Sequence, residues 1–129
     1  MRLGPETYDA PAAPGAGQTI VLYRHDCFGL GARSRPMRVV VDFVRLSHAS
    51  ASNGLRAYTK YSPGGSLREV KFGGLLPYTV PATTGDDDEV HDFEVATYPY
   101  FEVQFTANSA PTTWELVITK IFGVRDRGR

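Results

Sequence analysis

Cysteine is nearly absent from this sequence, since Cys27 is the only one among 129 residues. A single cysteine cannot form an intrachain disulfide, which excludes the stapled scaffolds of many small secreted domains. A chain of this length can bury a hydrophobic core without such a staple. We expect Cys27 to lie partly buried in a loop, with an interchain or reactive role as the alternative.

Long hydrophobic runs are also missing. A transmembrane helix needs roughly 20 consecutive apolar residues, whereas the longest candidate, the three valines 39–41, is followed directly by Asp42. The segment Leu3-Gly4-Pro5-Glu6 lacks the apolar character of a signal peptide. We therefore expect neither a membrane partner nor a secretory leader.

Charge of one sign does not dominate, because 14 Lys and Arg residues balance 14 Asp and Glu residues. A neutral chain has no overall attraction to nucleic acid or to an anionic membrane. Basic residues cluster only at Arg33 and Arg35 and in the tail from Arg125 to Arg129. No nucleic-acid partner is expected. The tail is interpreted as a frayed terminus or as a contact for phosphate or an acidic protein loop.

The motifs of common enzymes are lacking as well. The chain has three histidines at well-separated positions: His25, His48 and His91. Only His25 has a cysteine nearby, Cys27, and a zinc site would need two further close ligands. Neither a Gly-x-Ser-x-Gly elbow nor a phosphate-binding loop occurs, and Glu94 and Glu102 are predicted as ordinary surface acids on neighbouring strands. We expect no enzymatic activity, no catalytic residue, no cofactor and no metal site.

The most acidic stretch consists of four consecutive residues: Asp86, Asp87, Asp88 and Glu89. Their spacing is not that of an EF-hand loop, in which acids alternate with other residues. Adjacent carboxylates also repel one another. We expect a solvated acidic loop, with contact to a basic partner surface and calcium binding as the alternatives.

Most of the chain alternates strand-like runs with turn residues. Seven runs rich in β-branched and aromatic residues are predicted as strands: 19–24, 37–46, 55–61, 67–72, 90–97, 100–107 and 114–122. Asn53-Gly54 and Pro63-Gly64-Gly65 are strong turn signals between them, and no segment shows convincing helical periodicity. The pattern predicts an all-β domain, a β-sandwich or jelly roll of about seven to eight antiparallel strands.

Alternation along these runs predicts the core. The run 37–46 has apolar residues on both faces, which indicates a central strand covered on both sides. In the run 100–107, Glu102, Gln104 and Thr106 are predicted to point outward. The predicted core comprises nine inward residues: Val39, Val41, Phe43, Phe101, Val103, Phe105, Trp114, Leu116 and Ile118.

The chain begins with a segment rich in Pro, Gly and Ala, which favours neither a helix nor a central strand. We expect an extended arm over 1–18, a β-sandwich domain over 19–123 and a basic tail over 124–129. Leu3 and Tyr8 are the sizeable apolar residues of the arm and are predicted to contact a partner, with a floppy terminus as the alternative. The other predicted interface residues are charged: Asp86, Asp87, Asp88, Glu89, Arg125, Arg127 and Arg129.

Two segments combine with this arm to suggest a family. In LRAYTKYSPGGSLREV a strand turns straight back after Tyr-Ser-Pro-Gly-Gly, and in YPYFEVQFTANSAPTTWELVITKIFG two strands flank a Thr/Pro turn. From Met37 to Phe122 this layout resembles the capsid decoration, or cement, proteins of tailed phages.

The resemblance implies a structural virion protein that binds the outer capsid surface and reinforces the shell, after synthesis in the host cytoplasm. Decoration proteins typically sit as trimers at local three-fold axes. The implied partners are therefore the major capsid protein and further copies of this chain, with a homotrimer favoured. The family brings no catalytic residues.

Carbohydrate-binding and receptor-binding sandwiches share much of this layout. Six aromatic residues are candidates for a glycan-stacking platform: Tyr58, Tyr61, Tyr78, Tyr98, Tyr100 and Trp114. A glycan is thus an alternative partner. Another head, neck or tail subunit of a phage is a third interpretation.

Overall fold

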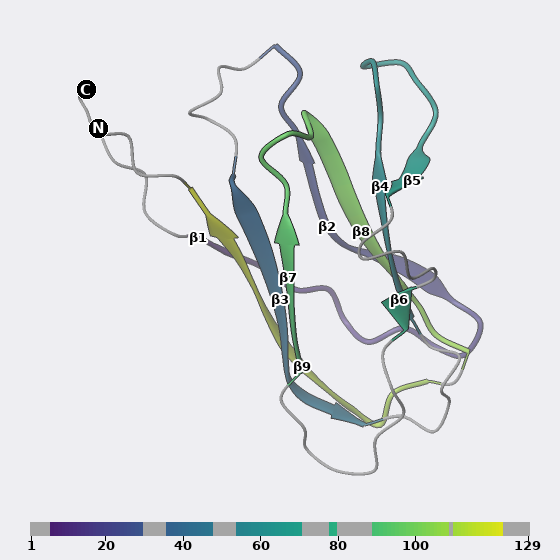
Figure 1. Cartoon of the computed structure of the whole chain (residues 1–129). Coiled ribbons are helices and arrows are strands. Elements are labelled where there is room, and N and C mark those ends of the chain that lie inside the picture. The colour runs from purple at the N-terminus through teal and green to yellow at the C-terminus, as the bar shows by residue number, and fades with distance from the viewer. Residues whose placement is uncertain are drawn as a thin grey trace.

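The computed structural model describes residues 6–29, 36–47, 54–70, 78–79, 89–108 and 110–122, without the side chains of residues 46, 47, 78, 79 and 89. Within these ranges the chain forms nine β-strands and no helix. Figure 1 shows the strands arranged as two sheets that face each other. The predicted all-β sandwich is confirmed. The described ranges accordingly hold no helix that is long and apolar enough to span a bilayer.

The first sheet has four antiparallel strands in the order β1-β9-β3-β7. These strands are β1 (Glu6–Tyr8), β9 (Thr113–Ile121), β3 (Arg38–Ser47) and β7 (Glu89–Glu94). The strand predicted to be central, β3, does lie between two neighbours. Its inner side chains Val39, Val41 and Phe43 are fully buried, whereas its outer side chains are half-buried or exposed. The prediction that both faces of this strand are covered is therefore wrong.

The second sheet is also antiparallel and has the order β2-β8-β4-β5, with β6 paired to β4 as well. Its strands are β2 (Thr19–Asp26), β8 (Tyr100–Thr106), β4 (Gly54–Thr59), β5 (Arg68–Val70) and β6 (Tyr78–Thr79). Each of the seven predicted runs corresponds to one observed strand. The short strands β1 and β6 are additional.

The core lies between the two sheets, where aromatic rings interlock. Phe43 of β3 and Phe105 of β8 have ring centroids 5.9 Å apart, and the Trp114 ring lies 5.2 Å from Phe105 in an edge-on arrangement. Eight of the nine predicted core residues are buried, and Trp114 is half-buried against the same cluster. Such packing removes the largest apolar surfaces of the chain from water.

The N-terminal segment is part of the sandwich from Glu6 onward. Strand β1 pairs with β9, and the Lys120 Nζ atom lies 3.0 Å from the Glu6 carboxylate. Tyr8 packs edge-on against Tyr23, with ring centroids 5.0 Å apart. Gly17, whose φ of 79° suits glycine, donates its N–H to a carbonyl oxygen at the end of β8. The described part of the predicted arm thus has fixed contacts with its own domain.

Candidate functional site

The predicted interface residues fall mostly outside the described ranges. Leu3, the acids 86–88 and the arginines of the tail are not described, and of Glu89 only the backbone is placed, opposite Phe43. Tyr8 is half-buried in its own domain, where it packs on the core. Within the described residues, the surfaces open to a partner or ligand are the outer faces of the two sheets.

The candidate metal and acid–base groups are not brought together. His25 Nδ1 lies 2.7 Å from the Tyr23 hydroxyl, and its Nε2 lies 3.2 Å from the carbonyl oxygen of Tyr98. His48 lies outside the described ranges. Among the described residues no group of three or more His, Cys, Asp or Glu side chains is placed to hold a metal ion.

The pair Glu94 and Glu102, predicted to lie on neighbouring strands, is separated between the two sheets, on β7 and β8. His91 of β7 faces the core, where its ring and that of Phe43 form a T-shaped pair with centroids 5.8 Å apart. Burial lowers the pKa of His91.

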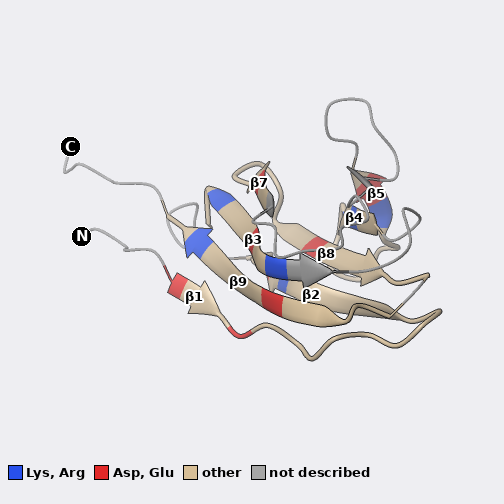
Figure 2. Cartoon of the chain, turned by 90° about the horizontal axis from the view of Figure 1, so that it is seen from below, with Lys and Arg blue, Asp and Glu red and all other residues tan. Residues whose placement is uncertain are grey.

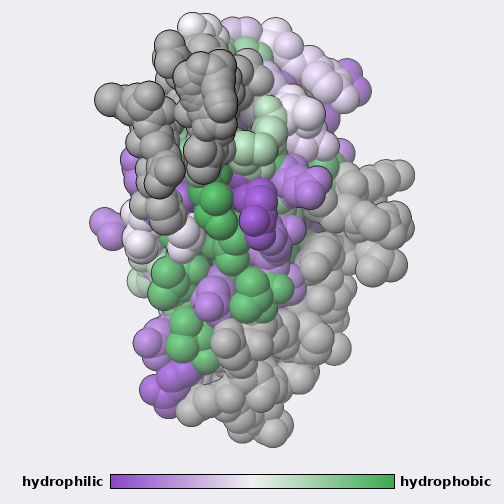
Figure 3. Space-filling model, turned by 60° about the vertical axis from the view of Figure 1, so that its left-hand side comes forward, coloured by the Kyte–Doolittle hydropathy of each residue, from purple (hydrophilic) through white to green (hydrophobic). Residues whose placement is uncertain are grey.

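The outer face of the four-stranded sheet carries a set of valines around one acid. Val90 of β7 and Val117 of β9 lie on either side of Asp42 of β3 in register, and they are 55% and 40% exposed. Val40 and Val44 of β3 are half-buried on the same face. We call these four valines the valine face. Figure 3, which brings this side forward, shows hydrophobic residues gathered along it.

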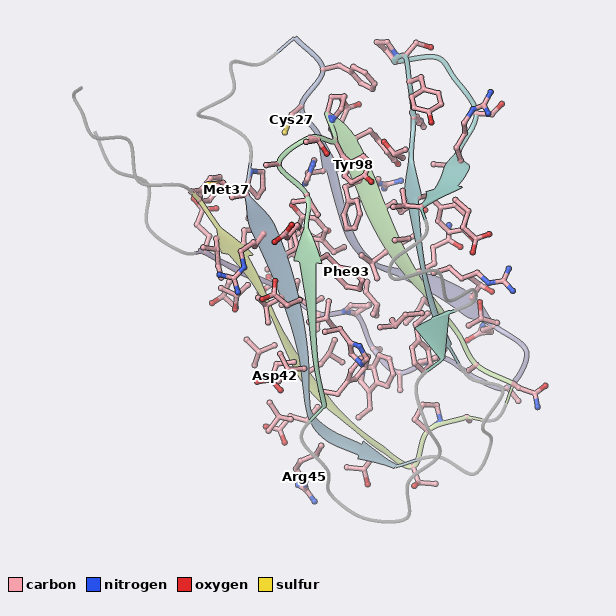
Figure 4. All side chains as sticks on the ribbon, in the orientation of Figure 1. Cys27, Met37, Asp42, Arg45, Phe93 and Tyr98 are labelled. Atoms are coloured by element: carbon pink, nitrogen blue, oxygen red, sulfur yellow. The ribbon has the colours of Figure 1, made fainter. Side chains whose placement is uncertain are left out.

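Charged residues lie between and beside these valines. The Arg38 guanidinium forms an ion pair and hydrogen bonds with Asp92 on the neighbouring strand, which raise the pKa of Arg38. Figure 4 shows Phe93 pointing between the sheets while Asp42 points to the opposite side. This face thus combines exposed apolar area with interspersed polar groups, as protein-contact surfaces do.

The outer face of the five-stranded sheet differs, because a polar network lies at its middle. Glu102 of β8 is only 4% exposed although it points away from the core. Its carboxylate accepts two hydrogen bonds of 2.6 Å each, from the Tyr100 hydroxyl and from Gln104 Nε2. Arg24 of β2 and Tyr58 of β4 flank Glu102 in register. We call these five residues the Glu102 cluster.

Hydrogen bonds and nearby charges act on this cluster. Arg24 hydrogen-bonds the Tyr100 hydroxyl, and this bond together with the nearby Glu102 carboxylate raises the pKa of Arg24. Burial, together with the hydrogen bond to Glu102, raises the pKa of Tyr100. Lys60 Nζ lies 4.5 Å from the centre of the Tyr100 ring, in a cation–π contact. Figure 2 shows that acidic and basic positions are interspersed along the strands rather than separated.

Sequence reasoning identified Glu102 as an outward residue but missed its burial. The prediction that it is an ordinary surface acid is wrong. The available signal is the run Tyr100–Gln104, in which every second residue carries a hydrogen-bonding group able to reach its neighbour on the same face. The burial of Glu102 also depends on Arg24 and Tyr58, which flank it from the neighbouring strands β2 and β4.

The six aromatic residues proposed as a stacking platform do not share one surface. Trp114 and Tyr98 pack against the core, and Tyr100 is buried under Lys60. Tyr61 is 76% exposed with the Arg68 guanidinium 5.1 Å from its ring centre. The Tyr78 side chain is not described. Tyr58, which is half-buried, belongs to the Glu102 cluster and is the partly accessible ring on that face.

A scan against protein-family models, a search of the curated proteins and a search of the solved structures each find no significant match.

Proposed function

We propose that this chain is a structural virion protein, which binds the outer surface of a tailed-phage capsid and reinforces the shell as a decoration protein. It acts by protein–protein contact, with the major capsid protein and further copies of itself as partners. The support is the layout that resembles the decoration proteins, together with a confirmed β-sandwich fold.

The observation that carries the proposal is the valine face. Outward positions of a two-layer sandwich usually hold polar residues, because they face water. Here four outward valines lie in three adjacent strands, and two of them are at least 40% exposed. Exposed apolar patches of this kind are typical of protein contacts. Docking a partner on this face removes the valines from water, which stabilises the complex.

Binding to capsids tests this proposal with a matched pair of variants. Val117→Lys places a charge on the valine face, whereas Val21→Lys places one at a valine of similar exposure on the other sheet. Capsids of the phage that encodes the chain are sedimented with each protein. We expect the wild type and Val21→Lys to co-sediment and Val117→Lys to bind at least tenfold more weakly, because burying a charge in an apolar contact is costly even with Asp42 beside it. A wild-type chain that never co-sediments would overturn the proposal, and equal binding of Val117→Lys would overturn the role of this face.

Light scattering tests the expected oligomer. A decoration protein that occupies a three-fold axis is expected to be a trimer in solution or to become one on the capsid. A chain that stays monomeric in solution and binds capsids as isolated single copies contradicts the trimer.

Glycan binding is the second candidate function. The broad aromatic platform predicted for it is not assembled, so stacking alone does not support it. The Glu102 cluster favours it on different grounds, through hydrogen bonding.

A further inference from the structure

The geometry points to a ligand site on the face opposite the valine face: we propose that the Glu102 cluster binds a neutral saccharide through its hydroxyl groups. This proposal does not depend on the capsid-binding function, because the two surfaces belong to different sheets. A virion protein that binds the capsid through one face can bind a saccharide outside the particle through its other face.

The Glu102 cluster is held rigidly. Glu102 is nearly buried, and both of its oxygens accept short hydrogen bonds from Tyr100 and Gln104. A buried carboxylate is tolerated only when it is hydrogen-bonded in this way. Those bonds fix the two donor side chains in turn. Polar groups held in place before binding lose little entropy when a ligand arrives.

Hydrogen-bond donors and acceptors are balanced on this face. Arg24, Arg56 and Lys60 supply cationic donors on this face, with Arg56 opposite Gln104 in register. The carboxylates of Asp26 and Glu69 lie at the margins, opposite Tyr100 and Tyr58. Together with Glu102, three positive and three negative groups cancel. The described residues of this face therefore carry no excess of either charge that would favour an ion. Sugar hydroxyls both donate and accept hydrogen bonds and so match such a mixed surface.

Tyr58 is placed where a sugar ring can pack on it. Its half-buried ring lies on β4 between Arg56 and Lys60 and directly opposite Glu102. Next-but-one residues on a strand are about 6.6–7 Å apart. A sugar ring that covers the Tyr58 ring can therefore reach the Arg56 or the Lys60 side chain with its hydroxyl groups. The apolar face of a sugar packs on such a ring, and its hydroxyls point to the polar neighbours.

The experiment has a screening step and a mapping step. The full chain is applied to an array of neutral and acidic glycans, and the best neutral oligosaccharide is titrated by calorimetry and by amide chemical shifts. We expect binding whose affinity changes less than about threefold when salt is raised, because a neutral ligand releases no screened charge. The shifted amides are expected on β2, β8 and β4.

Variants then assign the residues. Arg24→Gln and Tyr58→Ala are expected to weaken binding at least tenfold, whereas Arg38→Gln, which alters an exposed arginine on the valine face, is expected to leave it unchanged. Glu102 is a positioning residue, so Glu102→Gln is expected to weaken sugar binding tenfold while capsid co-sedimentation is retained. Loss of both activities in Glu102→Gln would indicate a structural role only.

Three results would overturn the proposal. One is the absence of binding to every glycan on the array by the folded chain. Another is preferential, salt-sensitive binding of acidic glycans or of poly-glutamate, which would indicate an anion site. The third is binding whose amide shifts map to β7 and β9. None of these results bears on capsid binding.

Discussion

The indole Nε1 of Trp114 donates a 3.0 Å hydrogen bond to the carbonyl oxygen of Pro11, which lies 103 residues earlier in the chain. The bond ties the Pro-rich segment that follows β1 to the start of β9. The same segment is also held by backbone hydrogen bonds of Gly17 and Gln18 with Ala107 and by the burial of Pro14.

Replacing this donor tests how firmly the segment is attached. Trp114→Phe keeps an aromatic ring but removes the N–H and part of the packed ring, and we expect a loss of about 1–3 kcal/mol in the free energy of unfolding. Urea denaturation measures it, and faster amide exchange at Gly17 is expected in the same variant. Tyr61→Phe, at an exposed position, is the control. Unchanged exchange at Gly17 would show that the bond does not hold the segment.

Two valines of different burial test where the core ends. Val41→Ala removes two methyl groups from a fully buried position and is expected to cost about 2 kcal/mol in unfolding free energy. Val117→Ala removes the same groups from the valine face, where the side chain is 40% exposed, and should cost less than about 0.5 kcal/mol. Equal losses in chemical denaturation would contradict the placement of Val117 on an open face.

Acid should destabilise the fold through His91. Burial holds the pKa of this imidazole below its ordinary value of 6.5, so the unfolded chain takes up a proton at a pH where the folded chain does not. Stability is therefore complete above about pH 6.5 and falls as the pH drops below it, by at most about 1.4 kcal/mol per pH unit for one group.

The measurement compares the wild type with His91→Leu at about pH 7.5 and about pH 5.5 by urea unfolding. Carboxylates titrate in both proteins, so their contribution cancels in the difference. We expect the leucine variant to lose less stability on acidification. A wild-type loss that equals that of the variant would show that folding does not lower the pKa of His91.

An engineered disulfide tests whether β1 pairs with β9 of the same chain or with β9 of another copy. Thr7 and Thr119 are direct partners in the β1–β9 ladder, and such partners have Cα atoms about 4.5–5.5 Å apart, within the range that a disulfide spans. Thr7→Cys with Thr119→Cys should form an intrachain bond and migrate as a monomer on a non-reducing gel. Cys27 is buried and does not compete. Thr7→Cys alone is the control, and covalent dimers or trimers of the double variant would show that the strand is exchanged between copies.

Much of the fold was predictable because alternation is a local property. Phe101, Val103 and Phe105 were placed inward and are fully buried, since side chains in a strand point to opposite faces in turn. Strand β1 was not predicted, because three residues between prolines and glycines carry no pattern of their own. Strand β1 forms because it pairs with β9 and because Tyr8 packs against Tyr23.

The candidate sites were harder to predict because they are assembled across strands. Val90, Asp42 and Val117 meet only once β7, β3 and β9 are in register, and no spacing along the chain reveals this. Glu102 similarly depends on Arg24 and Tyr58 from other strands. The predicted contacts at 86–88 and in the tail lie outside the described residues and stay predictions.

The pairing of the first strand with the last also constrains how the protein is made. On the ribosome, β1 and β3 are both synthesised well before β9, yet each needs β9 as a neighbour. Until β9 emerges, β3 has only β7 beside it and β1 has no partner, so the sheet that carries Val39 and Phe43 is incomplete. Loops closed over so many residues also form slowly. A nascent chain of this kind is expected to depend on chaperones during translation, and one truncated before β9 to aggregate.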